Sequence, residues 1–223
     1  MDDHRHPHHR GRHGNPEDFE RYLARLEDPE RVRWQTPDRV VRALGLRPGQ
    51  AACDVGAGPG YFTLRLARAV GPRGRVYAVD PEPRMLEALG ERLGRLRLRN
   101  VTPVLGRDDD PLVPDRSCDL VLVVNTYHHF PDGPAYLRRL VRVLRPGGRI
   151  VNVDFHRRET PVGPPIAHRV AREDFLRDAR RAGLALRAEL DFLPYQYGLV
   201  LVPRGRASRG GGRARWRDRR ATG

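Results

Sequence analysis

The chain has 223 residues, of which 39% are hydrophobic and 31% are charged. This length suits one domain with a sizeable core and some additional segments. No stretch approaches the ~18 consecutive apolar residues that cross a membrane. The N-terminus also lacks the apolar segment of a secretory signal. The composition therefore favours a cytoplasmic globular protein and excludes a membrane-spanning one.

The formal net charge is +14, and all 42 basic residues are Arg. Residues 203–223 carry eight Arg and one Asp, so this segment alone supplies half of the excess charge. The segment is also rich in Gly, and its composition predicts disorder. Arg/Gly segments bind RNA through phosphate contacts and stacking. A nucleic-acid partner is therefore an open alternative, although the rest of the chain is only mildly basic.

Residues 1–14 contain five of the nine His and few apolar residues, which predicts a disordered leader. The two cysteines, Cys53 and Cys118, fall beside predicted core strands. We expect them to be buried free thiols, as in a reducing compartment. No Cys or carboxylate stands at ligand spacing near the His-rich leader, so we predict no metal site.

The most informative stretch is residues 54–60, with the sequence DVGAGPG. It follows a short apolar run and precedes a helical pattern, which predicts a buried strand, a glycine turn and a helix. Three glycines in five residues are poorly explained by packing, but they are expected where backbone passes close to a ligand. A dinucleotide-binding turn would have its third glycine at position 61, which is Tyr61, and Asp54 would repel a pyrophosphate.

This acidic-x-G-x-G-x-G sequence resembles the first motif of the class I methyltransferases that use S-adenosylmethionine (SAM). The resemblance implies that the turn lies against the amino-acid part and the ribose of SAM. The residues assigned to the cofactor on this basis are Asp54, Gly56, Ala57, Gly58 and Gly60. A purely structural glycine turn and a divergent dinucleotide site remain alternatives.

A second predicted strand, residues 75–80, ends in Asp80. A carboxylate at this position can accept hydrogen bonds from both hydroxyls of a ribose. The family places an acid here for that task, and the resemblance implies further cofactor contacts for Pro81 and Met85. Asp80 is also expected to be the N-cap of the helix predicted over 81–97.

The third predicted strand, residues 101–105, is followed by three consecutive aspartates. The family commonly has one acid here that hydrogen-bonds the adenine amino group. Both Asp108 and Asp109 are candidates for this role, and Asp108 is preferred over Asp109. A solvated acidic loop is the alternative.

The most apolar run, residues 118–124, predicts a buried central strand. It delivers residues 125–130, with the sequence NTYHHF, to the carboxyl edge of the sheet, where ligands of open α/β sheets bind. Asn125 is assigned to the cofactor. Two adjacent His rarely both have a core role, because each imidazole would need a buried partner. The predicted catalytic residues are therefore His128 and His129, either of which can remove a proton from the acceptor, and Tyr127, which orients it. Histidines that lie behind the pocket or on the surface are the alternative.

The remaining patterns complete an α/β fold. Residues 15–46 predict a helical cap in which Trp34 and Gln35 lie in the break between two helices. Residues 156–169 predict a loop that acts either as a substrate lid or as a simple connection. The other predicted elements are a helix over 134–145, a strand over 149–155, a helix over 172–182 and an antiparallel strand pair over 184–192 and 195–202.

The predicted fold is a Rossmann-like, doubly wound sheet of seven mostly parallel strands with one antiparallel strand and helices on both faces. The predicted domain spans residues 15–202, with the cap over 15–46 and the core over 47–202.

Taken in chain order, these motifs are similar to those of stand-alone, type 11 or ubiquinone-biosynthesis-like methyltransferases. This group includes enzymes that methylate quinones, sterols and arsenite. The resemblance implies methyl transfer from SAM to a small-molecule acceptor by in-line displacement. The arsenite branch is excluded because it relies on several cysteines. An RNA or protein methyltransferase that uses the basic tail, and a non-catalytic SAM-binding protein, remain alternatives.

Overall fold

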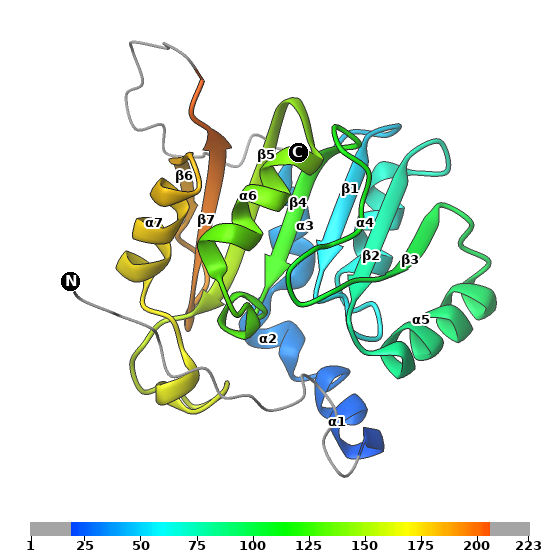
Figure 1. The fold of residues 1–223 in the computed structure, drawn as a ribbon. Coiled ribbons are helices and arrows are strands. Elements are labelled where there is room, and N and C mark those ends of the chain that lie inside the picture. Colours follow the sequence, from blue (N-terminus) through cyan, green and yellow to red (C-terminus); the bar gives the residue numbers. More distant parts are fainter. Residues whose placement is uncertain (1–18, 206–223) are drawn as a thin grey trace, which may run out of the picture.

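A seven-stranded sheet forms the centre of the protein (Figure 1). The computed structural model describes residues 19–205, and the strand order is β3-β2-β1-β4-β5-β7-β6. β7 pairs antiparallel with β5 and β6, whereas the other pairs are parallel. The predicted sheet is confirmed. The strands are β1 (Ala51–Val55), β2 (Arg75–Asp80), β3 (Val101–Leu105), β4 (Cys118–Val124), β5 (Leu144–Phe155), β6 (Leu184–Leu190) and β7 (Gln196–Pro203).

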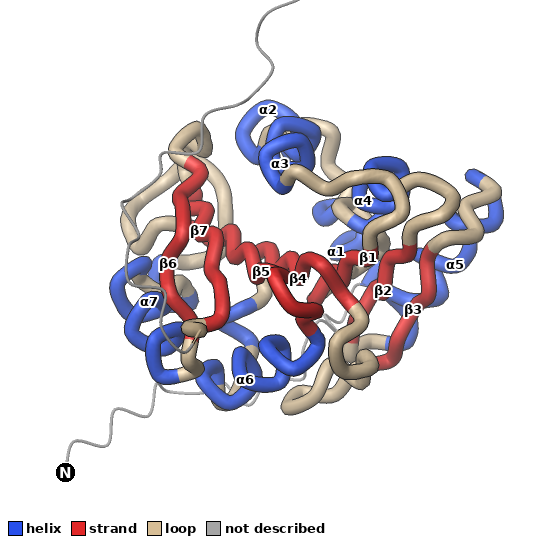
Figure 2. Tube along the Cα trace, turned by 90° about the horizontal axis from the view of Figure 1, so that it is seen from above, coloured by secondary structure: helices blue, strands red, loops and turns tan. Residues whose placement is uncertain are grey.

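Helices cover both faces of this sheet (Figure 2). α3, α4 and α5 lie on one face and α6 and α7 on the other, and each layer has its own buried apolar cluster. None of the described helices is long and apolar enough to span a membrane. The helices are α1 (Phe19–Leu26), α2 (Arg31–Gln35), α3 (Pro37–Leu44), α4 (Thr63–Val70), α5 (Pro83–Leu96), α6 (Gly133–Val143) and α7 (Arg172–Arg181), with 3₁₀ turns η1 (Tyr127–His129) and η2 (Ile166–His168).

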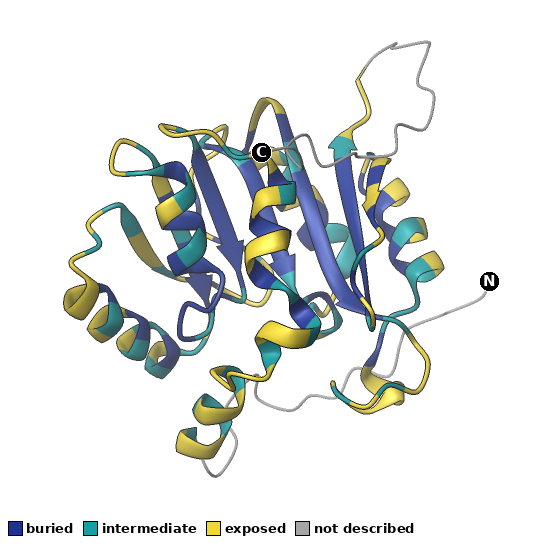
Figure 3. Cartoon of the chain, turned by 180° about the vertical axis from the view of Figure 1, so that it is seen from behind, coloured by how far each residue is buried: buried dark blue, intermediate teal, exposed yellow. Residues whose placement is uncertain are grey.

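The central strands are buried on both faces, as their uninterrupted apolar sequences predict. Every residue of β1 is buried, and in β4 only Asp119 and Val124 are partly exposed. Figure 3 shows the buried strands between helices whose outer faces are exposed. Because β1, β2, β3, β4 and β5 run parallel, their carboxyl ends meet at one edge of the sheet. This edge carries the residues that the sequence assigns to a ligand.

The N-terminal cap has three short helices where the sequence predicts two. Trp34 and Gln35 lie inside α2, so the prediction that they occupy a break is wrong. The break falls at Thr36, whose φ of 40° ends α2, and Pro37 then begins α3. A proline fits the first turn of a helix because its missing N–H has no partner there. Residues 1–18 and 206–223 lie outside the described residues, so the leader and the Arg/Gly tail stay predictions.

Candidate active site

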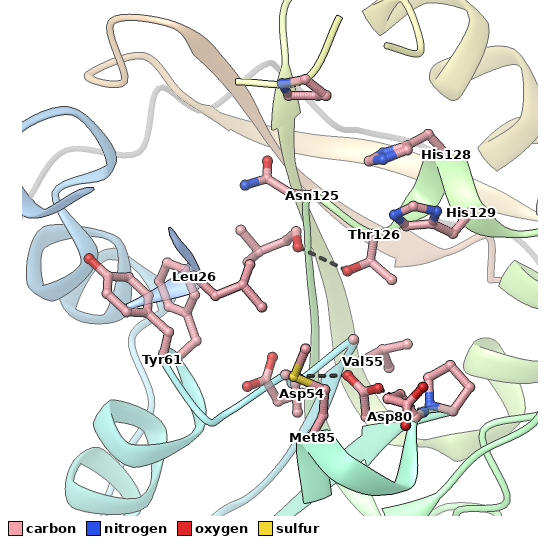
Figure 4. A pocket seen from close by; sticks show the side chains of 18 of the residues that line it. Leu26, Asp54, Val55, Tyr61, Asp80, Met85, Asn125, Thr126, His128 and His129 are labelled. Atoms are coloured by element: carbon pink, nitrogen blue, oxygen red, sulfur yellow. Dashed lines mark hydrogen bonds between the residues drawn. The ribbon is translucent and has the colours of Figure 1, made fainter. Parts of the chain in front are cut away.

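A cavity of about 810 Å³ lies at the carboxyl edge of the parallel strands. Its walls come from the ends of β1, β2 and β4, from α1 and α2 of the cap, and from the loop between β5 and α7. Figure 4 shows side chains from these separate segments facing the same space. The cavity therefore lies where the fold class predicts a ligand.

The glycine loop, residues 54–60, forms the floor of this cavity. All three glycines have positive φ, at 73° for Gly56, 52° for Gly58 and 95° for Gly60. A Cβ at Gly56 would lie 2.1 Å from Oγ1 of Thr126, and one at Gly60 would lie 2.5 Å from a methyl group of Leu89. The expectation that packing explains little of this glycine run is therefore wrong for Gly56 and Gly60, where a side chain would collide with a neighbouring residue.

Gly58 is the glycine that leaves room beside the cavity. The nearest atom to a Cβ built there is a methyl carbon of Leu26, at 3.7 Å. Gly56, Ala57 and Gly58 line the cavity, whereas Gly60 does not, because its position packs against α5. Backbone at residues 56–58 can therefore approach a ligand closely.

Asp80 stands at the end of β2 with its carboxylate held by backbone groups. The N–H of Gly58 donates to Oδ2 at 2.8 Å, and the N–H of Glu82 donates to Oδ1 at 3.0 Å. Each carboxylate oxygen has a second lone pair that can accept a ligand hydroxyl. The expectation that Asp80 is the N-cap of α5 is wrong, because Glu82 occupies that position and accepts from the N–H of Arg84.

Asp54 is a second carboxylate at the cavity floor, and it is only 2% exposed. The hydroxyl of Thr63 donates to its Oδ2 at 2.6 Å. Burial raises the pKa of Asp54 to about 6, and the nearby charge of Asp80 acts in the same direction. A cationic ligand group beside these two carboxylates would lower the cost of ionising Asp54.

The remaining cofactor candidates divide between the cavity and its surroundings. Pro81, Met85 and Asp108 line the cavity, and Met85 is almost fully buried. Asp109 does not line it, so of the two aspartates predicted after β3 only Asp108 reaches the ligand space. The glycine loop, the strand-end carboxylate and these walls fit a nucleoside that carries a cationic group, as SAM does.

A chain of amide side chains connects the cap to the cavity. Arg31 donates to Oε1 of Gln35, and Nε2 of Gln35 donates to Oε1 of Gln196 at 3.2 Å. Nε2 of Gln196 then donates to Oδ1 of Asn125 at 2.6 Å. Asn125 lines the cavity with a φ of 53°. The interaction of the cap with β7 therefore fixes the side chain of this predicted cofactor contact.

His128 and His129 both line the cavity, and Figure 4 shows them side by side. Their ring centroids are 4.1 Å apart. His129 is exposed, whereas the side chain of His128 is only 12% exposed and has its Nδ1 3.7 Å from Oδ2 of Asp154. The fold thus places both predicted bases at the cavity, in different surroundings.

Tyr127 points away from the cavity, contrary to its predicted role in orienting the acceptor. It is buried, its hydroxyl donates to Oδ2 of Asp178 at 2.9 Å, and its ring packs edge-on against Phe175 at 4.7 Å. The next residue in the 3₁₀ turn projects in a different direction, so Tyr127 and His128 cannot both face the ligand. Tyr127 anchors η1 to α7.

Replacing Tyr127 with Phe is expected to lower the free energy of unfolding by about 1.5–3 kcal/mol, because it removes a hydrogen bond to a buried carboxylate. Urea denaturation measures this change. SAM affinity should stay within about twofold of the wild-type value. An unchanged free energy of unfolding would contradict the anchoring role.

The loop after β5 closes the far side of the cavity. Trp34 packs against Phe155 with ring centroids 5.4 Å apart, and Val162, Pro164 and Pro165 continue this apolar wall. Arg169 is 6% exposed and holds the loop in place. Its guanidinium donates to the carbonyl oxygens of Pro164 at 2.8 Å, Arg158 at 2.7 Å and His156 at 3.1 Å.

Replacing Arg169 with Met is expected to loosen this loop, because the backbone carbonyl groups of the loop lose the guanidinium that donates to them. Trypsin should then cleave after Arg157 or Arg158 at least about ten times faster than in the wild-type protein. Mass spectrometry of the fragments identifies the site of cleavage. The matched control is Arg187→Met on exposed β6, which should leave cleavage in the loop unchanged. Equal rates in both variants would show that Arg169 does not hold the loop.

Sequence reasoning missed several residues of the site. Tyr61 lines the cavity, and the guanidinium groups of Arg31 and Arg65 each lie over its ring, at 3.9 and 4.5 Å from the centroid. Asp154 and Arg169 are charged residues buried in the core. A charged residue inside an apolar strand, such as Asp154 in β5, was the available signal.

Residues 52–148 match the family described as "Methyltransferase domain". The chain is 35% identical over 124 residues to a demethylmenaquinone methyltransferase of Staphylococcus aureus, covering 56% of this chain and 51% of the relative. It is 29% identical over 133 residues to a protein of the same name from Geobacillus, covering 60% and 56%. The chain thus spans about half the length of these curated relatives.

Solved structures share the architecture. A SAM-dependent methyltransferase from Aquifex aeolicus has a TM-score of 0.77 and 26% identity, covering 80% of this chain and 95% of that one. A geranyl diphosphate C-methyltransferase from Streptomyces coelicolor, solved with S-adenosyl-L-homocysteine, has a TM-score of 0.66. It is 17% identical and covers 86% of each chain, which supports the fold alone. With the glycine loop and the strand-end carboxylate in place, the chain is similar to the class I SAM-dependent methyltransferases, in sequence over residues 52–148 and in fold.

Proposed function

We propose that this chain is an enzyme that transfers a methyl group from SAM to a small-molecule acceptor. The observation that carries the proposal is that one cavity joins the glycine loop to two histidines and an aromatic wall. A protein that only bound the cofactor would not need the second part of the cavity, which the histidines and the aromatic side chains line. Two buried free cysteines are consistent with a reducing compartment such as the cytoplasm.

The cofactor half is assigned by chemistry. Asp80 accepts hydrogen bonds from the ribose hydroxyls, and Asp108 accepts one from the adenine amino group. Asp54 provides negative charge for the cationic end, beside the backbone of Gly56 and Gly58. When bound, SAM supplies an electrophilic methyl group on a sulfonium, which is already a good leaving group.

The acceptor half favours a flat, apolar molecule. Trp34, Phe155 and Phe130 offer aromatic surface, and Pro164 and Pro165 add a rigid apolar edge. Aromatic side chains bind flat rings by offset stacking. We propose a ring that carries an ionisable hydroxyl, of the reduced-quinone type that the names of the relatives suggest.

The protein accelerates this reaction by alignment, water exclusion and proton removal. The aromatic wall and the loop held by Arg169 orient the ring and exclude water. His128 or His129 then removes the proton of the acceptor hydroxyl, a task for which an imidazole is well suited near neutral pH. No residue needs to form a covalent intermediate.

Calorimetric titration with SAM, S-adenosylhomocysteine and NADH tests the cofactor assignment. We expect micromolar binding of the first two and none of NADH. Methyl transfer is then measured by mass spectrometry with 1,4-dihydroxynaphthalene, catechol and a tRNA transcript as acceptors. Methylation of the naphthalene ring compound supports the proposal. Methylation of the transcript alone, or binding of NADH alone, would overturn it.

A further inference from the structure

Asp154 is a buried carboxylate that the proposed function does not use. It lies on β5 with 0% exposure, and its Oδ1 accepts a hydrogen bond from the N–H of Phe155 at 2.8 Å. Its Oδ2 has no hydrogen-bond partner among the described residues. An unpaired carboxylate oxygen in a protein core is costly, and buried polar groups are nearly always paired. This cost indicates a role other than stability.

The ionisable side chain beside this oxygen is His128. Nδ1 of His128 lies 3.7 Å from Oδ2 of Asp154, and Nδ1 is likewise buried without a hydrogen-bond partner within residues 19–205. The separation exceeds a hydrogen bond by about half an ångström. A small rotation of the imidazole closes it. Two unpaired atoms of complementary chemistry, one from η1 and one from β5, therefore face each other at the cavity wall.

We propose that Asp154 is a positioning residue for His128: Oδ2 accepts the hydrogen on Nδ1, so that Nε2 presents its lone pair to the acceptor hydroxyl. This inference rests on the proposed function, and it assigns the base to one of the two histidines. The hydrogen bond made by one ring nitrogen decides which nitrogen carries the proton. Asp154 also stabilises the imidazolium that forms when the base accepts a proton.

The surroundings favour His128 over His129 as the base. His129 is exposed and its ring lies against that of His128 at a tilt of 41°, whereas His128 is mostly buried and faces the carboxylate of Asp154. Tyr197 is another titratable group near the pair, and it stands opposite Asp154 in the β5–β7 register. Burial and the charge of Asp154 raise the pKa of Tyr197 far above its usual range, so it stays neutral. His156 packs against the ring of Tyr197, at 5.7 Å.

The chemical step balances without any further reactant. The O–H bond of the acceptor breaks, its proton moves to Nε2 of His128, and its electron pair stays on the acceptor. The ionised acceptor forms a bond to the methyl carbon, from its oxygen or from an adjacent ring carbon, as the carbon–sulfur bond breaks and that electron pair remains on sulfur. A ring carbon that has attacked then loses its own proton to water. The proton on His128 then leaves to water through the cavity mouth.

The first test needs neither acceptor nor turnover. Long-range ¹H–¹⁵N NMR of the full-length wild-type protein at pH 8 reports which nitrogen of each neutral imidazole carries hydrogen, and a His128→Gln variant assigns the signal. We expect hydrogen on Nδ1 of His128. In Asp154→Leu, we expect the signal to shift toward the Nε2–H form that is preferred by free histidine. Hydrogen on Nε2 of His128 in the wild-type protein would overturn the proposal.

The second test separates a functional from a structural role. Asp154→Leu removes the carboxylate but keeps the number and branching of the side-chain heavy atoms. With 1,4-dihydroxynaphthalene we expect kcat at pH 7 to fall about 100-fold, which is the low end for general base catalysis. SAM affinity and the KM of the acceptor should stay within about threefold. The difference in kcat between Asp154→Leu and the wild-type protein should become smaller as pH rises, because the acceptor hydroxyl then ionises without a base.

The control is Asp191→Asn, an exposed carboxyl after β6 that should change none of these values. An unchanged kcat in Asp154→Leu would overturn the proposal. If the wild-type protein binds SAM but methylates no probe, the proposed function fails, while the NMR measurement still decides whether Asp154 fixes the tautomer of His128. The two failures are therefore distinguishable.

Discussion

Replacing Asp80 with Asn is expected to weaken the binding of SAM about 100-fold. Each carboxylate oxygen accepts one backbone N–H, from Gly58 or Glu82, and can accept a ribose hydroxyl with its second lone pair. The amide keeps one acceptor and loses both the second acceptor and the charge. Hydrogen bonds to charged groups contribute about 1.5–3 kcal/mol each, and about 2.8 kcal/mol corresponds to 100-fold in affinity.

Calorimetry with SAM, S-adenosylhomocysteine and adenosine measures this loss. All three carry the ribose, so we expect all three to weaken together. Asp191→Asn on the exposed surface is the matched control and should bind normally. Thermal unfolding of the apo-protein shows whether the glycine loop survives the change. Normal binding by a folded Asp80→Asn variant would remove this residue from the cofactor site.

The sheet was predictable because its sequence signals are local and mutually consistent. β2, β3 and β4 begin and end at the residues predicted, since apolar runs bounded by turn residues allow few other structures. The positions of Asp80, His128 and His129 at the cavity followed from the rule that parallel strands share a carboxyl edge. The carboxyl ends of β1, β2 and β4 therefore carry much of the candidate site, and all three could be located from the sequence.

The remaining features depend on contacts between segments far apart in the chain. Two of the three loop glycines are required by Thr126 and Leu89, which the loop sequence does not reveal. Tyr127 lies next to His128 in sequence, but it turns into the core to meet Asp178, 51 residues further on. The direction of a side chain in a 3₁₀ turn follows from such packing and not from composition.

The same limit applies to Asp154. An aspartate inside an apolar strand signals a special role, but its partner is known only once η1 and β5 are placed side by side. The amide chain from Arg31 to Asn125 likewise joins α2, β7 and the end of β4. The local sequence predicts the strands and loops that form the site. Polar contacts between segments far apart in the chain then fix the positions of its side chains.

Replacing Asp54 with Asn is expected to make the apo-protein more stable at pH 7.5 while weakening its affinity for SAM. Burial raises the pKa of Asp54 from its ordinary 3.8 to about 6. Below pH 3.8 the carboxyl is protonated in both the folded and the unfolded state. Between pH 3.8 and 6 the folded state holds more protons, so stability falls as pH rises through this range. A difference of about two pH units corresponds to roughly 3 kcal/mol.

The amide introduced by Asp54→Asn can still accept the hydroxyl of Thr63 but never ionises, so urea denaturation should show no loss of stability that is specific to pH 4–6. SAM binding provides the second measurement. Its cationic end favours the ionised carboxylate, so binding at pH 6 should release about half a proton from the wild-type protein. Titrations in buffers of different ionisation enthalpy report this number, which should fall toward zero in Asp54→Asn. Two results would contradict this prediction. One is an Asp54→Asn variant that is less stable than the wild-type protein at pH 7.5, and the other is a variant that releases as many protons on binding SAM as the wild-type protein does.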